Sequence, residues 1–183
     1  TDDGGLTWSC RADGMRAEFL PPEMESEPWQ QDPHLLVQSP SNPDRLWVQH
    51  HNGIFFSSDG SASWQELHAK PSSFGFAVAV HPSEPDTAWF VPGIKDELRI
   101  PVDGKLVVTR TRDGGKTWQS LTNGLPQTHA YDLAYRHALT IDKAGNRLAF
   151  GTTTGNVYVT EDQGESWQTL SNSLPPVHAV RFI

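Results

Sequence analysis

The stretch Thr111-Arg112-Asp113-Gly114-Gly115-Lys116-Thr117-Trp118 has the pattern Ser/Thr-x-Asp-x-Gly-x-Ser/Thr-Trp, and this pattern occurs four times. We call each copy a box. Full copies also start at Thr1 and Thr160, and a copy with Ser61 in place of the glycine starts at Ser57. The box tryptophans, spaced by 56, 54 and 49 residues, are Trp8, Trp64, Trp118 and Trp167. A period of about 50 residues built from short apolar segments is typical of propellers and other repeat arrays.

Each repeat contains four short apolar segments separated by turn residues, which predicts four-stranded antiparallel blades. In the blade at 34–67 the predicted strands are His34–Ser39, Arg45–His50, Ile54–Ser57 and Trp64–Leu67. In the blade at 76–121 they are Phe76–His81, Thr87–Val91, Lys105–Thr109 and Trp118–Leu121. In the blade at 137–170 they are His137–Ile141, Arg147–Thr152, Val157–Thr160 and Trp167–Leu170. Residues 1–33 are interpreted as the end of a blade plus a long link, and 177–183 as the first strand of a further blade. The whole chain, 1–183, is thus predicted to be one all-β partial propeller.

The strand order predicts which face of the propeller carries each loop. In an antiparallel blade, the turns after the first and third strands lie at one end and the other connections at the opposite end. All four boxes follow a third strand, so they share one face. From Trp89 to Trp118 is 29 residues, against 17 from Trp47 to Trp64, so the second blade carries an insertion at 93–104 on the other face. Because loops on a rigid scaffold commonly carry function, we expect the site on the face opposite the boxes.

Composition excludes several functional classes. The chain has 14 Lys and Arg against 22 Asp and Glu, a net charge of −8, and no basic run. Nucleic-acid binding needs clustered cations, so no nucleic-acid partner is expected. No apolar run reaches the length of a membrane span, so no membrane association is expected. The single cysteine, Cys10, permits no internal disulfide and leans towards the cytoplasm.

A partial propeller leaves apolar sheet faces uncovered at both ends. The chain also begins inside a box and without Met. We therefore expect the remaining blades to come from a missing N-terminal half or from a second chain.

The boxes resemble the Asp-box (bacterial neuraminidase) repeat of sialidases, sortilin-type receptor domains and bacterial propellers described as glycosyl hydrolases. The likeness covers the whole chain and is nearest to bacterial propellers of about seven blades, which implies that the chain is the C-terminal half of such a ring. It implies no cofactor. In that family the box aspartate accepts backbone N–H groups across its turn, and the tryptophan packs between sheets. The residues with these implied structural roles are Asp3, Trp8, Asp59, Trp64, Asp113, Trp118, Asp162 and Trp167.

Sialidases bind the substrate carboxylate with three arginines and use a Tyr–Glu nucleophile pair with an Asp acid. The tripeptide Arg99-Ile100-Pro101 is similar to the Arg-Ile-Pro of that family. The family's copy precedes the first box, whereas this one lies in the insertion between two boxes. The resemblance therefore implies the propeller fold and does not by itself imply the sialidase reaction.

Charged side chains gather on the insertion and on the link before the third blade. The candidate catalytic residues, chosen because carboxylates beside Tyr can act as acid and base on a glycosidic bond, are Asp96, Glu97, Asp132 and Tyr131. The candidate ligand-binding residues, which can make charge-assisted hydrogen bonds to a sugar or an anion, are Lys95, Arg99, Asp103, Arg136, His137 and His34. A solvated loop pinned by ion pairs would give the same pattern.

The histidines predict no metal site. His34 and His137 occupy equivalent positions in their strands, but no HxH or HxxxH pair occurs, so hydrogen-bonded histidines are expected. The leading hypothesis is a propeller that binds a carbohydrate or a small anionic ligand on the face opposite the boxes. The alternatives are a sialidase-like glycoside hydrolase with paired carboxylates, and a protein-interaction scaffold that docks a partner through the acidic segment Glu23–Glu27.

Overall fold

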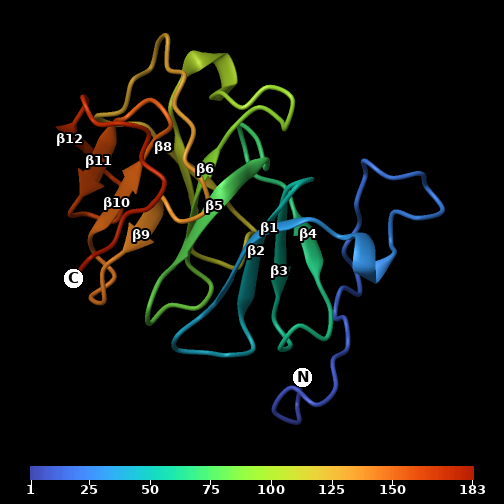
Figure 1. Ribbon diagram of the computed structural model, residues 1–183. Coiled ribbons are helices and arrows are strands. Elements are labelled where there is room, and N and C mark those ends of the chain that lie inside the picture. The colour runs from blue at the N-terminus through green and yellow to red at the C-terminus, as the bar shows by residue number, and fades with distance from the viewer.

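The computed structural model describes residues 1–183 and contains three four-stranded antiparallel sheets (Figure 1). The first consists of β1 (Pro33–Gln38), β2 (Leu46–His50), β3 (Ile54–Ser57) and β4 (Gln65–Leu67). The second consists of β5 (Gly75–Val80), β6 (Ala88–Pro92), β7 (Val108–Thr111) and β8 (Gln119–Leu121). The third consists of β9 (Leu139–Ile141), β10 (Leu148–Gly151), β11 (Val157–Thr160) and β12 (Gln168–Ser171). Short 3₁₀ turns occur at η1 (Pro28–Gln30) and η2 (Val102–Gly104).

The strands of each sheet follow chain order as a meander, and the three sheets lie side by side (Figure 1). The first strands adjoin one another, with β1 against β5 and β5 against β9. This is a partial β-propeller, so the fold predicted from the sequence is confirmed. The largest difference at a strand start is in β7, which begins at Val108 and not at Lys105. The reason is that Leu106 donates its N–H to Pro126, in the link after β8, at 2.9 Å.

The hydrophobic core fills the spaces between adjacent sheets. Trp47 of β2 packs against Phe56 of β3 and Phe90 of β6, and its indole N–H donates to Pro85 at 3.0 Å. Between the second and third sheets, Trp89 and Phe150 belong to one buried cluster. Because β3, β5 and β6 are buried along their whole length, their sequences are largely continuous apolar runs and not alternating patterns.

The segments outside the three sheets form no further strands. Residues 9–32 cover one face of the first sheet, where Ala12 and Met15 share a buried cluster with Phe55 and Trp64. Residues 177–183 make one isolated parallel bridge, between Ala179 and His137. The strand predicted there is absent because no second strand adjoins it to complete a ladder. The further blades expected from the sequence stay a prediction. The structure has no helix with the length and apolarity needed to cross a membrane.

Each box forms the same hydrogen-bonded loop, and three of the four join a third strand to a fourth. Asp59 accepts bonds from the N–H and the hydroxyl of Ser63, at 2.9 and 2.6 Å. The equivalent aspartates, which make the same pair of bonds, are Asp3, Asp113 and Asp162. Trp64 and Trp167 are buried, Trp118 is partly buried, and Trp8 is 74% exposed because no sheet lies beside it.

Candidate functional site

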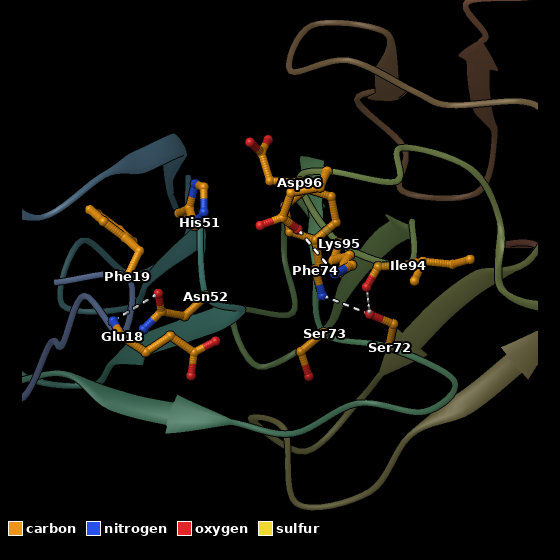
Figure 2. A pocket seen from close by; sticks show the side chains of 11 residues that line it. Glu18, Phe19, His51, Asn52, Ser72, Ser73, Phe74, Ile94, Lys95 and Asp96 are labelled. Carbon is orange, nitrogen blue, oxygen red and sulfur yellow. Dashed lines mark hydrogen bonds and ion pairs between the residues drawn. The ribbon is translucent and has the colours of Figure 1, made fainter.

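A cleft of about 490 Å³ opens on the face opposite the boxes. Figure 2 shows its walls: Phe19 of the N-terminal segment and His51 of the β2–β3 turn lie on one side, and Lys95 and Asp96 of the insertion on the other. The link between β4 and β5, residues 72–74, lies between the two walls. The cleft is therefore built from the variable connections of two neighbouring blades, the kind of position where ligand sites commonly occur.

Hydrogen bonds between side chains and backbone groups, and one between two backbone groups, fix the walls of this cleft. The amide of Asn52 accepts from the Glu18 N–H at 3.2 Å and donates to the Arg16 carbonyl at 2.6 Å, which ties the N-terminal segment to the β2–β3 turn. On the other side, Gly93 donates its N–H to Phe74 at 2.9 Å, and the Ser72 hydroxyl donates to the Ile94 carbonyl at 3.5 Å. The cleft is thus largely pre-formed.

Each carboxylate of the cleft lies beside a cation. Glu18 is 3.3 Å from Arg16, Asp96 is 2.6 Å from Arg99, and Glu97 is 3.5 Å from Lys95. A hydrogen bond from its own backbone N–H and the nearby Lys95 ammonium lower the pKa of Glu97. Arg16 is shared with Glu66, to which its Nε donates at 2.7 Å, so the cleft presents hydrogen-bonding groups whose charges are largely, but not fully, offset.

Phe76, near the start of β5, is surrounded by cationic and aromatic groups next to the cleft. His34 stacks on its ring at 4.3 Å, with 11° between the planes, and Tyr135 meets it edge-on at 5.2 Å. The guanidinium carbons of Arg99 and Arg136 lie 5.1 and 5.5 Å from the ring centroid. Arg136 also donates from Nε to the His34 carbonyl at 2.7 Å, so the third blade is connected to the first at this point.

The structure distributes the candidate catalytic residues over three places. Asp96 and Glu97 line the cleft. Asp132 is buried, and its Oδ1 accepts from the Thr154 hydroxyl at 2.6 Å and the Asn156 amide at 2.7 Å, which holds the β10–β11 turn. Tyr131 lines a separate hollow of about 390 Å³.

The candidate ligand-binding residues are likewise only partly brought together. Lys95 lines the cleft, while the side chains of His34, Arg99 and Arg136 surround Phe76. Asp103 lies in the hollow that contains Tyr131. The exposed residue His137 accepts, through its carbonyl, bonds from the Val180 N–H at 3.0 Å and Arg181 Nη1 at 3.1 Å.

Sequence reasoning missed the residues that the N-terminal segment contributes. Glu18 and Phe19 precede the proline-rich link and carry no motif. The one available signal was Phe19, an aromatic residue in a polar segment, which is 48% exposed in the structure and meets His51 edge-on at 4.7 Å.

The chain is similar to several solved propeller structures. An ancestral GH74 enzyme matches with a TM-score of 0.59 and 18% identity, over 76% of this chain and 18% of that one. The GH74 xyloglucanase from Xanthomonas campestris matches with a TM-score of 0.57 and 18% identity, over 75% and 20% of the two chains. YCF48 from Cyanidioschyzon merolae matches with a TM-score of 0.53 and 20% identity, over 76% and 39%.

A YCF48 structure bound to D1 peptide also matches, with a TM-score of 0.52 and 18% identity over 78% of this chain and 44% of that one. The chain thus spans about a fifth of each GH74 enzyme and less than half of YCF48. No protein-family model and no curated protein matches it. At these identities the likeness establishes the propeller fold alone.

Proposed function

We propose that the protein is a binding propeller whose cleft, between the N-terminal segment and the insertion, takes a neutral carbohydrate. The observation that carries this proposal is the half-exposed ring of Phe19 beside three carboxylates, each paired with a cation. A sugar ring offers a C–H face that packs on an aromatic ring, and hydroxyls that need hydrogen-bond acceptors and donors. The cleft supplies both.

The charge pattern favours a neutral ligand over an anionic one. Glu18, Asp96 and Glu97 all line the cleft, and Lys95 is the one Lys or Arg side chain in its lining. An anion placed among these carboxylates would meet like charges, which disfavour it. The hydroxyls of a neutral sugar, in contrast, can donate to carboxylate oxygens already held by Arg16, Arg99 and Lys95.

Two observations weigh against glycoside hydrolysis at this site. A general acid in such enzymes has a raised pKa, whereas the pKa of Glu97 is lowered. Asp132, the third candidate carboxylate, is buried and accepts hydrogen bonds from Thr154 and Asn156 of the β10–β11 turn. The cleft therefore favours ligand binding over glycoside hydrolysis.

A peptide is the second candidate ligand. It is favoured by the likeness to the YCF48 structure that is bound to D1 peptide. The paired charges of the cleft would suit a polar peptide as they suit a sugar, since both offer donors to carboxylates. Screening the protein against a glycan library and a peptide library distinguishes these two ligand classes.

A glycan array, followed by calorimetric titration of the glycans that bind, tests the proposal. We expect Phe19→Ala to weaken binding by at least about tenfold, or 1.4 kcal/mol. Trp29→Ala is the matched control, because Trp29 is an exposed aromatic residue of the same segment that does not line the cleft. The carbohydrate proposal is wrong if no glycan binds, or if both variants bind as the parent does. Binding from a peptide library that is lost in Phe19→Ala would favour the second candidate.

A further inference from the structure

Three potential metal ligands converge beside the cleft, at the edge of the first sheet. His51 Nδ1 is 3.3 Å from Asp32 Oδ2, and His34 Nε2 is 3.9 Å from the same oxygen. The three ligand atoms all lie within 4.8 Å of one another. They come from the start of β1 and from the β2–β3 turn, so antiparallel pairing within one blade brings them together.

His34 is held with one ring nitrogen free. It is the extra residue of a β-bulge, because Pro33 pairs with His50 while Leu35 pairs with the adjacent Gln49, and bulges redirect side chains. Its Nδ1 lies 2.7 Å from the carbonyl of Gly75, so Nδ1 carries the proton. The lone pair of Nε2 therefore points into the cluster without a hydrogen-bond partner, although the side chain is only 3% exposed.

The other two ligands are fixed through the backbone. The N–H of Asp32 donates to Nε2 of the buried His50 at 2.9 Å, and the N–H of His51 donates to the Asp32 carbonyl at 3.0 Å. The His51 ring is further restrained by edge contacts with Phe19 at 4.7 Å and with His34 at 5.7 Å (Figure 2 shows Phe19 and His51). These bonds fix the backbone of Asp32 and His51, so the ligands are positioned before any ion arrives.

We propose that Asp32, His34 and His51 bind a divalent transition-metal ion, of which Zn²⁺ is the representative. With bonds of about 2.0–2.2 Å, ligand atoms of a tetrahedral ion lie about 3.4 Å apart. The two distances to Asp32, 3.3 and 3.9 Å, are close to this value, and the two histidine nitrogens, within 4.8 Å of each other, would move together on binding. Two imidazoles and one carboxylate suit Zn²⁺ and its neighbours rather than Mg²⁺ or Ca²⁺, which prefer all-oxygen sites.

The chemistry of the surroundings agrees with ion binding at neutral pH. The Gly75 carbonyl accepts the hydrogen bond from Nδ1 of His34, which leaves the Nε2 lone pair available for an ion. Three protein ligands leave a fourth position for water or another donor. His51 also lines the cleft, so the three-residue cluster adjoins the cleft. The proposal does not depend on the ligand suggested for the cleft. The sequence alone did not predict this site, because it contains no HxH or HxxxH pair.

The test is a calorimetric titration of the untagged chain with ZnCl₂, repeated with Co²⁺ and followed by absorbance. We expect saturable binding of one ion per chain, weakened at least about tenfold in Asp32→Asn and in His51→Asn. His178→Asn is the control, since His178 is exposed and lies outside the cluster, and its affinity should equal that of the parent. Circular dichroism of each metal-free variant shows that it is folded before titration.

Thermal unfolding provides a second readout. Zn²⁺ in excess should raise the Tm of the parent and of His178→Asn, but not that of Asp32→Asn, because only an ion bound to the folded state stabilises it. The proposal is overturned if the parent shows no saturable binding below about 1 mM. It is equally overturned if Asp32→Asn and His51→Asn bind as tightly as the parent, because the ion would then sit elsewhere.

Discussion

The backbone N–H of Trp167 donates a hydrogen bond to the carbonyl of Asn123 at 2.9 Å. Asn123 belongs to the link that leaves the second sheet, whereas Trp167 precedes β12, the outer strand of the third. The same relationship recurs at 2.8 Å between Trp64 and Asp13, which lies in the N-terminal segment. The links before the first and third sheets therefore clamp the box tryptophan of the blade that follows, whereas Trp118 of the second sheet makes no such backbone bond.

The first prediction concerns Gly124, next to this clamp. It has a φ of +84°, and a Cβ there would lie 1.9 Å from the Trp167 carbonyl oxygen. We expect Gly124→Ala to reduce the free energy of unfolding by about 2–4 kcal/mol, since left-handed strain of about 1–2 kcal/mol adds to displacement of the link. Urea unfolding followed by tryptophan fluorescence measures it.

Gly4→Ala is the matched control for that experiment. Gly4 also has a positive φ, +71°, but nothing lies within 4 Å of its Cβ position. We expect the strain alone, about 1 kcal/mol or less in this exposed loop. Equal losses in the two variants would show that the clamp contributes nothing.

The sequence predicted the fold well because the fold depends on local signals. Turn residues such as Pro40–Asp44 and Pro82–Asp86 separate apolar runs of four to six residues, and the three four-stranded sheets confirm the predicted all-β partial propeller. Strand boundaries differ mainly where a long-range bond competes. Lys105 to Val107 read as strand but precede β7, because Leu106 is bonded to Pro126 in a distant link.

The site was only partly predictable, because it depends on how segments without repeats fold back. The insertion and the face it lies on followed from repeat arithmetic. Nothing local indicated that Phe19 would reach the cleft, or that a bulge would aim His34 towards Asp32 and His51. The sequence predicted a catalytic role for Asp132, yet its carboxylate accepts a hydrogen bond from the Thr154 hydroxyl and so holds the β10–β11 turn. A charge pattern in the sequence predicts which residue types lie on which face of the propeller. It does not predict which hydrogen-bond or ion-pair partner each side chain finds.

The second prediction concerns the ionisation of the box aspartates. Hydrogen bonds from the hydroxyl and then the N–H of Ser63, with another from Ser57, lower the pKa of Asp59 from 3.8 to about 2. A carboxylate with a lowered folded-state pKa stabilises the fold above the unfolded value. That contribution is lost as pH falls from 3.8 towards 2.

Carbon-detected NMR titration measures this pKa directly. We expect Ser63→Ala to raise the pKa of Asp59 towards 3.8, because the largest cause of the shift is removed. Ser58→Ala is the control, since the Ser58 side chain makes no bond to Asp59 and should leave the pKa unchanged. An unshifted pKa in the parent protein would contradict the hydrogen-bonded loop described for the box.

The third prediction concerns His50, which is fully buried at the end of β2 and accepts the Asp32 N–H. Burial lowers the pKa of His50 from 6.5 to about 4. Between these values the unfolded chain binds a proton at His50 that the folded chain does not, so stability must fall as pH is lowered from 6.5 to 4. At 1.36 kcal/mol per pKa unit, the loss from His50 is on the order of 3 kcal/mol.

Urea unfolding at pH 7.5 and pH 4.5, both in EDTA so that no ion contributes, measures this loss. We expect His50→Gln to be less stable than the parent at pH 7.5 but to lose less stability on acidification. A smaller pH dependence should remain in the variant, because burial also lowers the pKa of His34. His178→Asn, which removes an exposed histidine, should keep the full pH dependence of the parent. If His50→Gln and the parent lose equal free energy between the two pH values, His50 is not the group that makes this fold acid-sensitive.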